Sequence, residues 1–264
     1  MSLREHLSEL RHRLLWSIGA VIVGAILGYV FSDHLLQLLE TPYCSLPEKI
    51  RGVGDCQLFF LHPLDAFSVK INLALVTGLI LSSPVWLYQL WAFVAPGLRS
   101  KERRWGIAFV ASSIALFALG ATFAFLVLHP ALDFLLGALG PHVKSLLGVE
   151  QYLGFLGTLL LIFGASFEFP LLLVLLNFSG ILPFTRLQSF WRATVVGVFA
   201  FAAVATPSQD PLSMLALAVP MCALYAGALG IAWLHDRNKA RRLALDPIAS
   251  LGADEPTPRA ALHD

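Results

Sequence analysis

The chain has 264 residues, of which 57% are hydrophobic and only 13% are charged, and its mean hydropathy is +0.74. This small number of polar residues cannot cover the surface of a globule of this length. The composition therefore excludes an ordinary water-soluble domain and indicates solvation by lipid. The formal net charge of +1 gives no reason to expect a nucleic-acid partner.

The first predicted element begins with the motif HLSELRHRL at residues 6–14 and continues into an uncharged apolar segment at 14–31. That segment is longer than the core of most secretory signal peptides and close to the roughly 20 residues that span a bilayer, so we expect a permanent first span. Ahead of it, leucines recur at helical spacing, at Leu3, Leu7, Leu10 and Leu14. This stripe predicts an amphipathic helix that lies on the cytoplasmic membrane surface.

Charged residues divide the rest of the chain into further long apolar runs, which are continuous rather than alternating and therefore indicate helices in lipid. The six predicted spans cover residues 14–31, 71–95, 105–128, 153–178, 190–206 and 211–234. The last two are expected to be short or kinked, because Pro207 closes the fifth and Pro220 lies within the sixth. The predicted fold is thus an all-α integral membrane protein with one domain over residues 1–240, followed by a disordered cytoplasmic tail at 241–264.

The basic residues give this bundle an orientation. Fourteen of the 18 Lys and Arg residues lie in the N-terminal segment, the loops after spans two and four, and the C-terminal tail. The opposite loops contain only Lys49, Arg51 and Lys144, with Lys70 at the edge of span two. By the positive-inside rule, both termini are predicted to be cytoplasmic.

Two of the three cysteines, Cys44 and Cys56, fall in the first outside loop. An oxidising compartment would let them form a disulfide, although two separate free thiols are the alternative. Cys222 lies in span six, where packing is the simpler role.

Acidic residues at two places on the cytoplasmic side are candidates for ligand binding. Glu9 precedes Arg13 by four residues, so the two could simply form an intrahelical ion pair. Glu102 is the only acid in a strongly basic loop and could simply balance its neighbours. Alternatively, both carboxylates face a cationic ligand, for which a bidentate arginine is the strongest partner.

Glu168 is the only acidic residue inside a predicted span. A charge at the bilayer centre costs roughly 2.5–3.5 kcal/mol on insertion scales, so this side chain should face protein or a wet cavity. Gln89 is the expected hydrogen-bond partner, with Thr158 or Ser166 as alternatives, and both a structural role and a role in transport remain open.

The sequence contains no nucleotide-binding P-loop, no HExxH zinc motif and no CxxC pair. No catalytic site, cofactor or metal site is therefore expected, and the chain is not predicted to be an enzyme.

Four motifs in order, HLSELRHRL, LSSPVWLYQLWAFVAPGLRSKERR, ASFEFP and TPSQD, together resemble the TatC family, the polytopic subunit of the twin-arginine protein translocase. The resemblance covers roughly residues 3–235. The cysteine pair resembles the actinobacterial branch of that family. The resemblance implies a concave, glove-like helical bundle in the cytoplasmic membrane that binds twin-arginine signal peptides of folded precursors. It also implies a multimeric complex with single-span TatA-type and TatB-type subunits, driven by the proton gradient.

The resemblance also assigns roles to residues, which we carry over by position. In the family pattern, Glu9 and Glu102 form the acidic pair for the two arginines, and Arg11 and Phe93 occupy neighbouring positions of the signal-peptide site. The remaining positions are Gln89 and Glu168 on the concave membrane face, and Pro42 and Asp210 in the outside loops. A competing prediction is a small proton- or ion-coupled transporter with Glu168 as carrier site, which lacks the inverted repeat such folds usually have.

Overall fold

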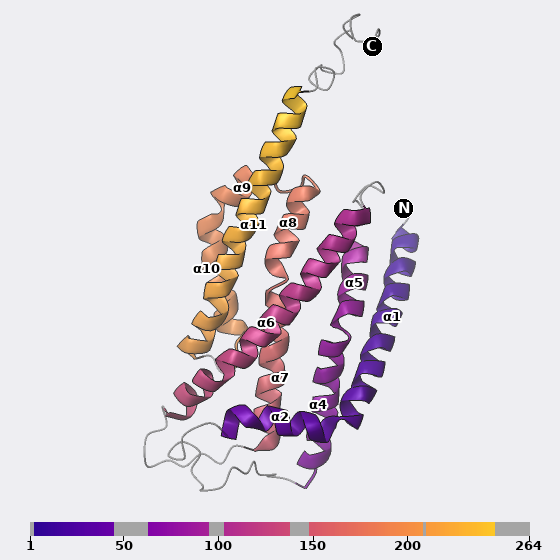
Figure 1. Ribbon diagram of the computed structural model, residues 1–264, viewed down its shortest axis with the longest axis vertical. Coiled ribbons are helices and arrows are strands. Elements are labelled where there is room, and N and C mark those ends of the chain that lie inside the picture. Colours follow the sequence, from indigo (N-terminus) through magenta and orange to yellow (C-terminus); the bar gives the residue numbers. More distant parts are fainter. Residues whose placement is uncertain (1–2, 45–62, 95–102, 138–147, 208–209, 246–264) are drawn as a thin grey trace, which may run out of the picture.

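The structure is a computed structural model that describes residues 3–44, 63–94, 103–137, 148–207 and 210–245, and every regular element among them is an α-helix (Figure 1). The helices are α1 (Leu3–Val30), α2 (Ser32–Cys44), α4 (Asp65–Leu81), α5 (Ser83–Val94), α6 (Arg103–Gly137), α7 (Val149–Ser166), α8 (Phe169–Phe178), α9 (Phe184–Ser189), α10 (Trp191–Ala205) and α11 (Pro211–Leu245). The predicted all-α class is confirmed.

Four segments are long and apolar enough to cross a membrane, namely Arg4–Val30, Gly106–Leu135, Val149–Phe178 and Pro211–Arg241. Helices α4 and α5 add a fifth if they are counted as one span, although they are bent by 56° relative to each other. Helix α10 is apolar but has only 15 residues, fewer than the roughly 20 that cross a typical bilayer. Six crossings therefore remain a prediction.

Two expectations about the ends of the bundle are wrong. The N-terminal segment is not a separate surface helix but the start of α1, which runs for 28 residues because no Gly or Pro interrupts its first turns. The sixth span is not short, since α11 continues for 35 residues through Pro220 and past the predicted boundary at residue 240. Good helix formers in the charged stretch after Trp233 extend that helix beyond the apolar part.

Small residues fix α1 against α4. Gly24 and Gly28 on α1 face Ala74 and Gly78 on α4, with the four-residue spacing that lets helix backbones approach closely in lipid. A Cβ atom on Gly78 would lie 2.6 Å from the backbone nitrogen of Ala25, so no larger residue fits without moving a helix. This contact sets the position of α1 beside the bent pair α4 and α5.

Helix α7 forms the centre of the bundle, between α4 and α6. Its side chains Leu156, Leu159 and Phe163 are almost fully buried. Helix α2 lies across one end of the bundle, where its Leu39 carbonyl accepts a 2.6 Å hydrogen bond from the Tyr152 hydroxyl on α7. The first residues of α1 and the last residues of α11 lie at the opposite end (Figure 1).

Candidate functional site

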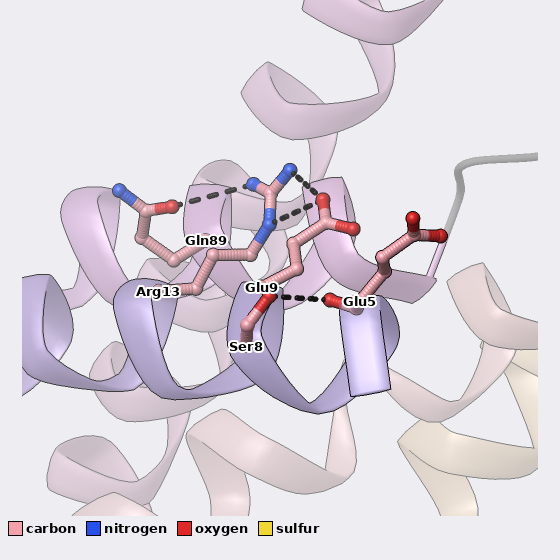
Figure 2. A network of polar contacts seen from close by, with 5 residues as sticks. All are labelled: Glu5, Ser8, Glu9, Arg13 and Gln89. Carbon is pink, nitrogen blue, oxygen red and sulfur yellow. Dashed lines mark hydrogen bonds and ion pairs between the residues drawn. The ribbon is translucent and has the colours of Figure 1, made fainter. Parts of the chain in front are cut away.

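A cluster of polar side chains joins the first turns of α1 to α5 (Figure 2). Arg13 donates two hydrogen bonds to the same oxygen of Glu9, from Nη2 at 2.6 Å and from Nε at 3.1 Å. Its third nitrogen, Nη1, lies 3.4 Å from the side-chain oxygen of Gln89 on α5. The intrahelical pair that the sequence allowed is therefore present, and Gln89 extends it to a second helix.

The Glu9 carboxylate remains accessible in this cluster. The side chains of Glu9 and Arg13 are 28% and 24% exposed. Both guanidinium contacts end on Oε1 of Glu9, and within the described part of the chain Oε2 has no hydrogen-bond or ion-pair partner. One oxygen of the carboxylate is thus open to a further donor.

Three other residues were expected near Glu9, and their outcomes differ. Phe93 lies four residues after Gln89 on the same face of α5, and its ring stacks on His6 of α1 with centroids 4.5 Å apart. Arg11 is exposed and follows Glu9 by two residues, which places it on the opposite side of α1. Glu102 lies outside the described residues, so its position beside Glu9 stays a prediction.

Glu168 occupies a different setting, at the turn between α7 and α8 where Pro170 interrupts the helical hydrogen bonding. Its side chain is only 9% exposed. Oε2 accepts a 2.7 Å hydrogen bond from the Ser113 hydroxyl on α6, and that hydroxyl accepts a 2.8 Å hydrogen bond from Nε1 of Trp91 on α5. Three helices therefore meet at this buried carboxylate.

The predicted pairing of Gln89 with Glu168 is wrong. Gln89 and Trp91 are two residues apart on α5 and so point to opposite sides of that helix, Gln89 toward Arg13 and Trp91 toward Ser113. The alternative donors do not reach Glu168 either, because Thr158 and Ser166 donate to carbonyls of their own helix. Sequence reasoning missed Ser113 and Trp91, which carry no local signal of their role.

The residues assigned to the outside loops have structural contacts of their own. Asp210 precedes α11, and its Oδ1 accepts a 2.7 Å hydrogen bond from the backbone N–H of Ser213, an N-cap with Pro211 in the first helical position. Pro42 lies within α2. Cys44 at the end of α2 is disulfide-bonded, its predicted partner Cys56 lies outside the described residues, and Cys222 is free.

A second polar connection, partly buried and also missed by sequence reasoning, links α11 to the end of α8 and the start of α9. Asp236 on α11 accepts a 2.8 Å hydrogen bond from the backbone N–H of Phe184. Asn177, the last polar residue of α8, donates to both oxygens of Asp236 at 3.3 and 3.4 Å. The two side chains lie at the ends of apolar runs, where polar residues are common and give no specific signal.

Helices α7, α8, α10 and α11 line an apolar cavity of about 590 Å³ that is partly open to the surface. Gly197 and Phe201 of α10 line one wall, and Phe169 and Met221 line the others. Among the described residues, no group of three or more His, Cys, Asp or Glu side chains is placed to hold a metal ion.

Comparisons with known proteins agree with this architecture. The family model described as "Sec-independent protein translocase protein (TatC)" matches residues 5–220. The chain is 45% identical to the Sec-independent protein translocase protein TatC of Frankia casuarinae, over 98% of this chain and 72% of the relative. It is 37% identical to the protein of the same description from Corynebacterium kroppenstedtii, over 92% of this chain and 64% of that relative's length.

The fold is similar to a solved structure described as "Crystal Structure of Twin Arginine Translocase Receptor- TatC in DDM". The TM-score is 0.73 and the sequence identity is 35%, with 86% of this chain and 99% of that chain covered. Both the sequence and the fold thus point to one family, whose members are described as transport proteins.

Proposed function

Because the chain belongs to the TatC family of Sec-independent protein translocase proteins, we propose that it is the receptor subunit of a twin-arginine translocase. It binds the paired arginines of signal peptides on folded precursors at the inner side of the cytoplasmic membrane. With single-span subunits of the TatA and TatB type, it then moves those precursors outward, driven by the proton gradient. The chain carries out transport and no catalysis.

The observation that carries this proposal is the state of the Glu9 carboxylate. Arg13 contacts only Oε1, so the free receptor already holds an arginine, yet not in the arrangement in which two nitrogens meet two oxygens. A guanidinium from a signal peptide can form that parallel, two-oxygen contact, which is the stronger geometry. Arg13 then keeps its contact with Gln89, and the peptide guanidinium replaces Arg13 as the partner of Glu9.

The same geometry accounts for a preference for arginine over lysine. The guanidinium presents its donors in a planar fork that matches both carboxylate oxygens, whereas an ammonium group is a point charge that cannot form the parallel pair. An ammonium group therefore gains less from Glu9 than a guanidinium does. A second carboxylate at Glu102 would serve the second arginine of the pair.

The orientation of the bundle follows from the basic residues. The first residues of α1 and the last residues of α11 lie at one end of the molecule, which is consistent with two termini on one side of the membrane. Arg11 and Arg13 near the start of α1, and Arg237 and Arg241 near the end of α11, make that the cytoplasmic side. A reporter that is active only in the cytoplasm should be active when it is fused after residue 245. A phosphatase that is active only after export should be inactive at the same position, and its activity would contradict this topology.

The single-span partners have a candidate surface at α10 and α11. Helix α10 has 15 residues, too few for a membrane of ordinary thickness. Its Val196 and Val204 are exposed, and its Gly197 and Phe201 line the 590 Å³ cavity. An apolar helix from a partner can fill this space. Photoreactive groups at position 196 should therefore crosslink to a single-span subunit in native membranes.

Peptide binding to the full chain in membrane vesicles tests the main proposal. Glu9→Gln removes the charge but keeps the shape of the side chain. It should weaken the binding of a twin-arginine peptide about tenfold to a hundredfold, since a hydrogen bond to a charged group contributes roughly 1.5–3 kcal/mol. Glu150→Gln, at the start of α7 and so at the other end of the bundle, is the matched control and should change nothing. Unchanged binding after Glu9→Gln together with Glu102→Gln would refute the assignment.

A further inference from the structure

A cavity of about 210 Å³ lies between α2, α4 and α7, at the end of the bundle that α2 crosses (Figure 1). Seven of the twelve residues that line it are leucines, and its polar members are Asn72 and Thr77 of α4. Leu35 and Leu39 of α2 form one wall, and the cavity is partly open to the surface. We refer to this feature as the α2 cavity.

The size and lining of the α2 cavity decide what can fill it. One turn of α-helix with its side chains, about 10 Å across and 5.4 Å long, takes up roughly 420 Å³, so no helix fits. An ordered water molecule needs roughly two to four polar partners, whereas Asn72 and Thr77 are about 140° apart around α4 and do not converge on one point. An empty cavity would leave its apolar walls without packing partners. The surrounding membrane supplies the remaining occupant, a flexible hydrocarbon chain.

The side-chain amide of Asn72 offers a polar contact inside the α2 cavity. Its Nδ2 atom lies toward α7, 3.8 Å from the position of a Cβ atom built on Gly154. Within the described residues, this side chain has no hydrogen-bond partner. An amide among membrane helices ordinarily finds an acceptor, because an unpaired donor in hydrocarbon is costly. The ester carbonyl of a glycerolipid is such an acceptor, and it is joined directly to an acyl chain.

An ion pair joins two walls of the α2 cavity at its edge. Lys70 of α4 comes one turn before Leu73, which lines the cavity. Asp33 of α2 comes two residues before Leu35, another lining residue. Nζ of Lys70 lies 3.3 Å from Oδ1 of Asp33, and the two side chains are 46% and 78% exposed. Because an exposed pair of this kind is weak and an ammonium group has three donors, Lys70 can also bind a phosphate that lies beside the cavity.

The depth of the α2 cavity matches one leaflet of a bilayer. On α4 its wall runs from Asn72 to Leu81, and nine residues of helix rise about 14 Å. That length is close to half of the roughly 30 Å hydrocarbon core. The order from the α2 end inward is a charge at Lys70, an amide at Asn72 and then a mainly apolar wall. A phospholipid has the same order of phosphate, ester and acyl chain.

From this order we propose that the α2 cavity binds one acyl chain of a membrane phospholipid from the leaflet next to α2. The chain fills the space between α2, α4 and α7, the amide of Asn72 donates to the ester carbonyl, and the phosphate contacts Lys70. The bound lipid then links α2 to the two helices beneath it. This inference goes beyond the proposed function and does not depend on it.

Photolabelling of the full chain by a lipid tests the site. The chain is reconstituted in vesicles of phosphatidylethanolamine and phosphatidylglycerol, in which a small share of the phosphatidylglycerol carries a photoreactive diazirine in its acyl chain. Leu73 and Leu153 line the cavity and are 5% and 4% exposed, so lipid on the outer surface of the bundle reaches them poorly. Leu126 of α6 is 66% exposed and reports that surface lipid. We expect adducts at all three residues, with saturation at a low lipid fraction only at Leu73 and Leu153.

A larger side chain at position 35 tests whether the acyl chain occupies the cavity. Leu35→Trp should lower the adducts at Leu73 and Leu153 about tenfold, because the methylene groups that it excludes lose their burial, and it should leave those at Leu126 unchanged. The matched control is Leu38→Trp, the same substitution on the same helix at a position that is 60% exposed and does not line the cavity. It should change none of the three. Thermal unfolding of both variants checks that α2 keeps its place.

The phosphate contact has a test of its own. A diacylglycerol with the same photoreactive chain lacks the phosphate, and it should label Leu73 and Leu153 about two- to fivefold less than the phospholipid does. Lys70→Gln should remove this difference between the two lipids. Asp33→Asn releases the ammonium group from its internal partner and should enlarge the difference.

Adducts confined to Leu126 would overturn the proposal, as would cavity adducts that Leu35→Trp leaves unchanged. Equal labelling by the diacylglycerol and the phospholipid would also overturn it, since the headgroup would then play no part. If Lys70→Gln and Asp33→Asn weaken the labelling by both lipids equally, the ion pair only holds α2 in place and the phosphate contact is refuted. No peptide is used, so none of these outcomes bears on the receptor site at Glu9.

Discussion

Glu9 and Glu168 are both acids on helices rich in apolar residues, yet their surroundings differ in two respects. Glu9 is 28% exposed and is held by the charged guanidinium of Arg13 through one oxygen. Glu168 is 9% exposed and is held by the neutral hydroxyl of Ser113, which Trp91 supports in turn. The first carboxylate has a partner that another arginine can replace, and the second has partners fixed by three packed helices.

The difference has energetic consequences. The Glu9–Arg13 pair is partly exposed, and ion pairs four residues apart on a helix surface contribute only about 0.3–0.5 kcal/mol, so exchanging Arg13 for a ligand costs little. A buried hydrogen-bonded network is costly to disrupt, because donors that lose their acceptor also cannot regain water. The Glu9 cluster is therefore suited to reversible binding, whereas the Glu168 cluster is suited to holding α5, α6 and α7 in register.

The largest expected effect is loss of stability in Glu168→Ala. Ser113 loses its acceptor in a buried site, which should lower the free energy of unfolding by about 2–3 kcal/mol. Glu168→Gln keeps an oxygen for Ser113 and should remain close to the unchanged chain. Thermal unfolding in detergent, with membrane abundance measured in parallel, checks both variants.

The opposite result would break the comparison. If Glu168→Ala has normal stability and binds signal peptide but fails to export precursors, Glu168 acts in transport. Like Glu9, it would then be a functional residue and not one that stabilises the packing of the helices.

Helix class and the approximate starts of α6, α7, α10 and α11 could be predicted from the sequence, because long uncharged runs have few alternatives in lipid. The merging of the N-terminal segment with α1 was foreseeable from the lack of Gly or Pro before Gly19, but the amphipathic leucine stripe suggested a separate helix. The length of α11 was missed because charged residues mark the edge of a membrane span and not the end of a helix.

For the candidate site, local spacing predicted the Glu9–Arg13 pair correctly, since residues four apart on a helix are neighbours. The partner of Glu168 could not be predicted in the same way. Which face of α5 meets α6 depends on the bend at Ser82 and on the close contact of α1 with α4, and neither is visible in a single helix sequence. Unless the orientation of α5 about its own axis is known, Gln89 and Trp91 are equally good candidates for the partner of Glu168.

A smaller effect is expected for Arg13→Gln, which removes the internal competitor for Glu9. Binding of twin-arginine and twin-lysine peptides should both strengthen about two- to fivefold and by the same factor, because a competitor lowers every ligand's apparent affinity equally. Arg4→Gln, a charge change in the first turn of the same helix, is the control. Weaker binding in Arg13→Gln would instead mean that Arg13 positions the Glu9 carboxylate.

The smallest effect is expected for Gln89→Leu, which keeps the side-chain volume and removes the acceptor that lies 3.4 Å from Arg13. That distance is beyond the usual range for an N–H to O hydrogen bond, so peptide affinity should change less than about twofold.

Combined with Arg13→Gln, the Gln89→Leu substitution should add nothing, because its partner is already gone. Combined with Glu168→Gln, the two changes in stability should add within about 0.5 kcal/mol, since the residues share no partner. Strong coupling between positions 89 and 168 would restore the pairing that the sequence suggested and would join the two clusters into one.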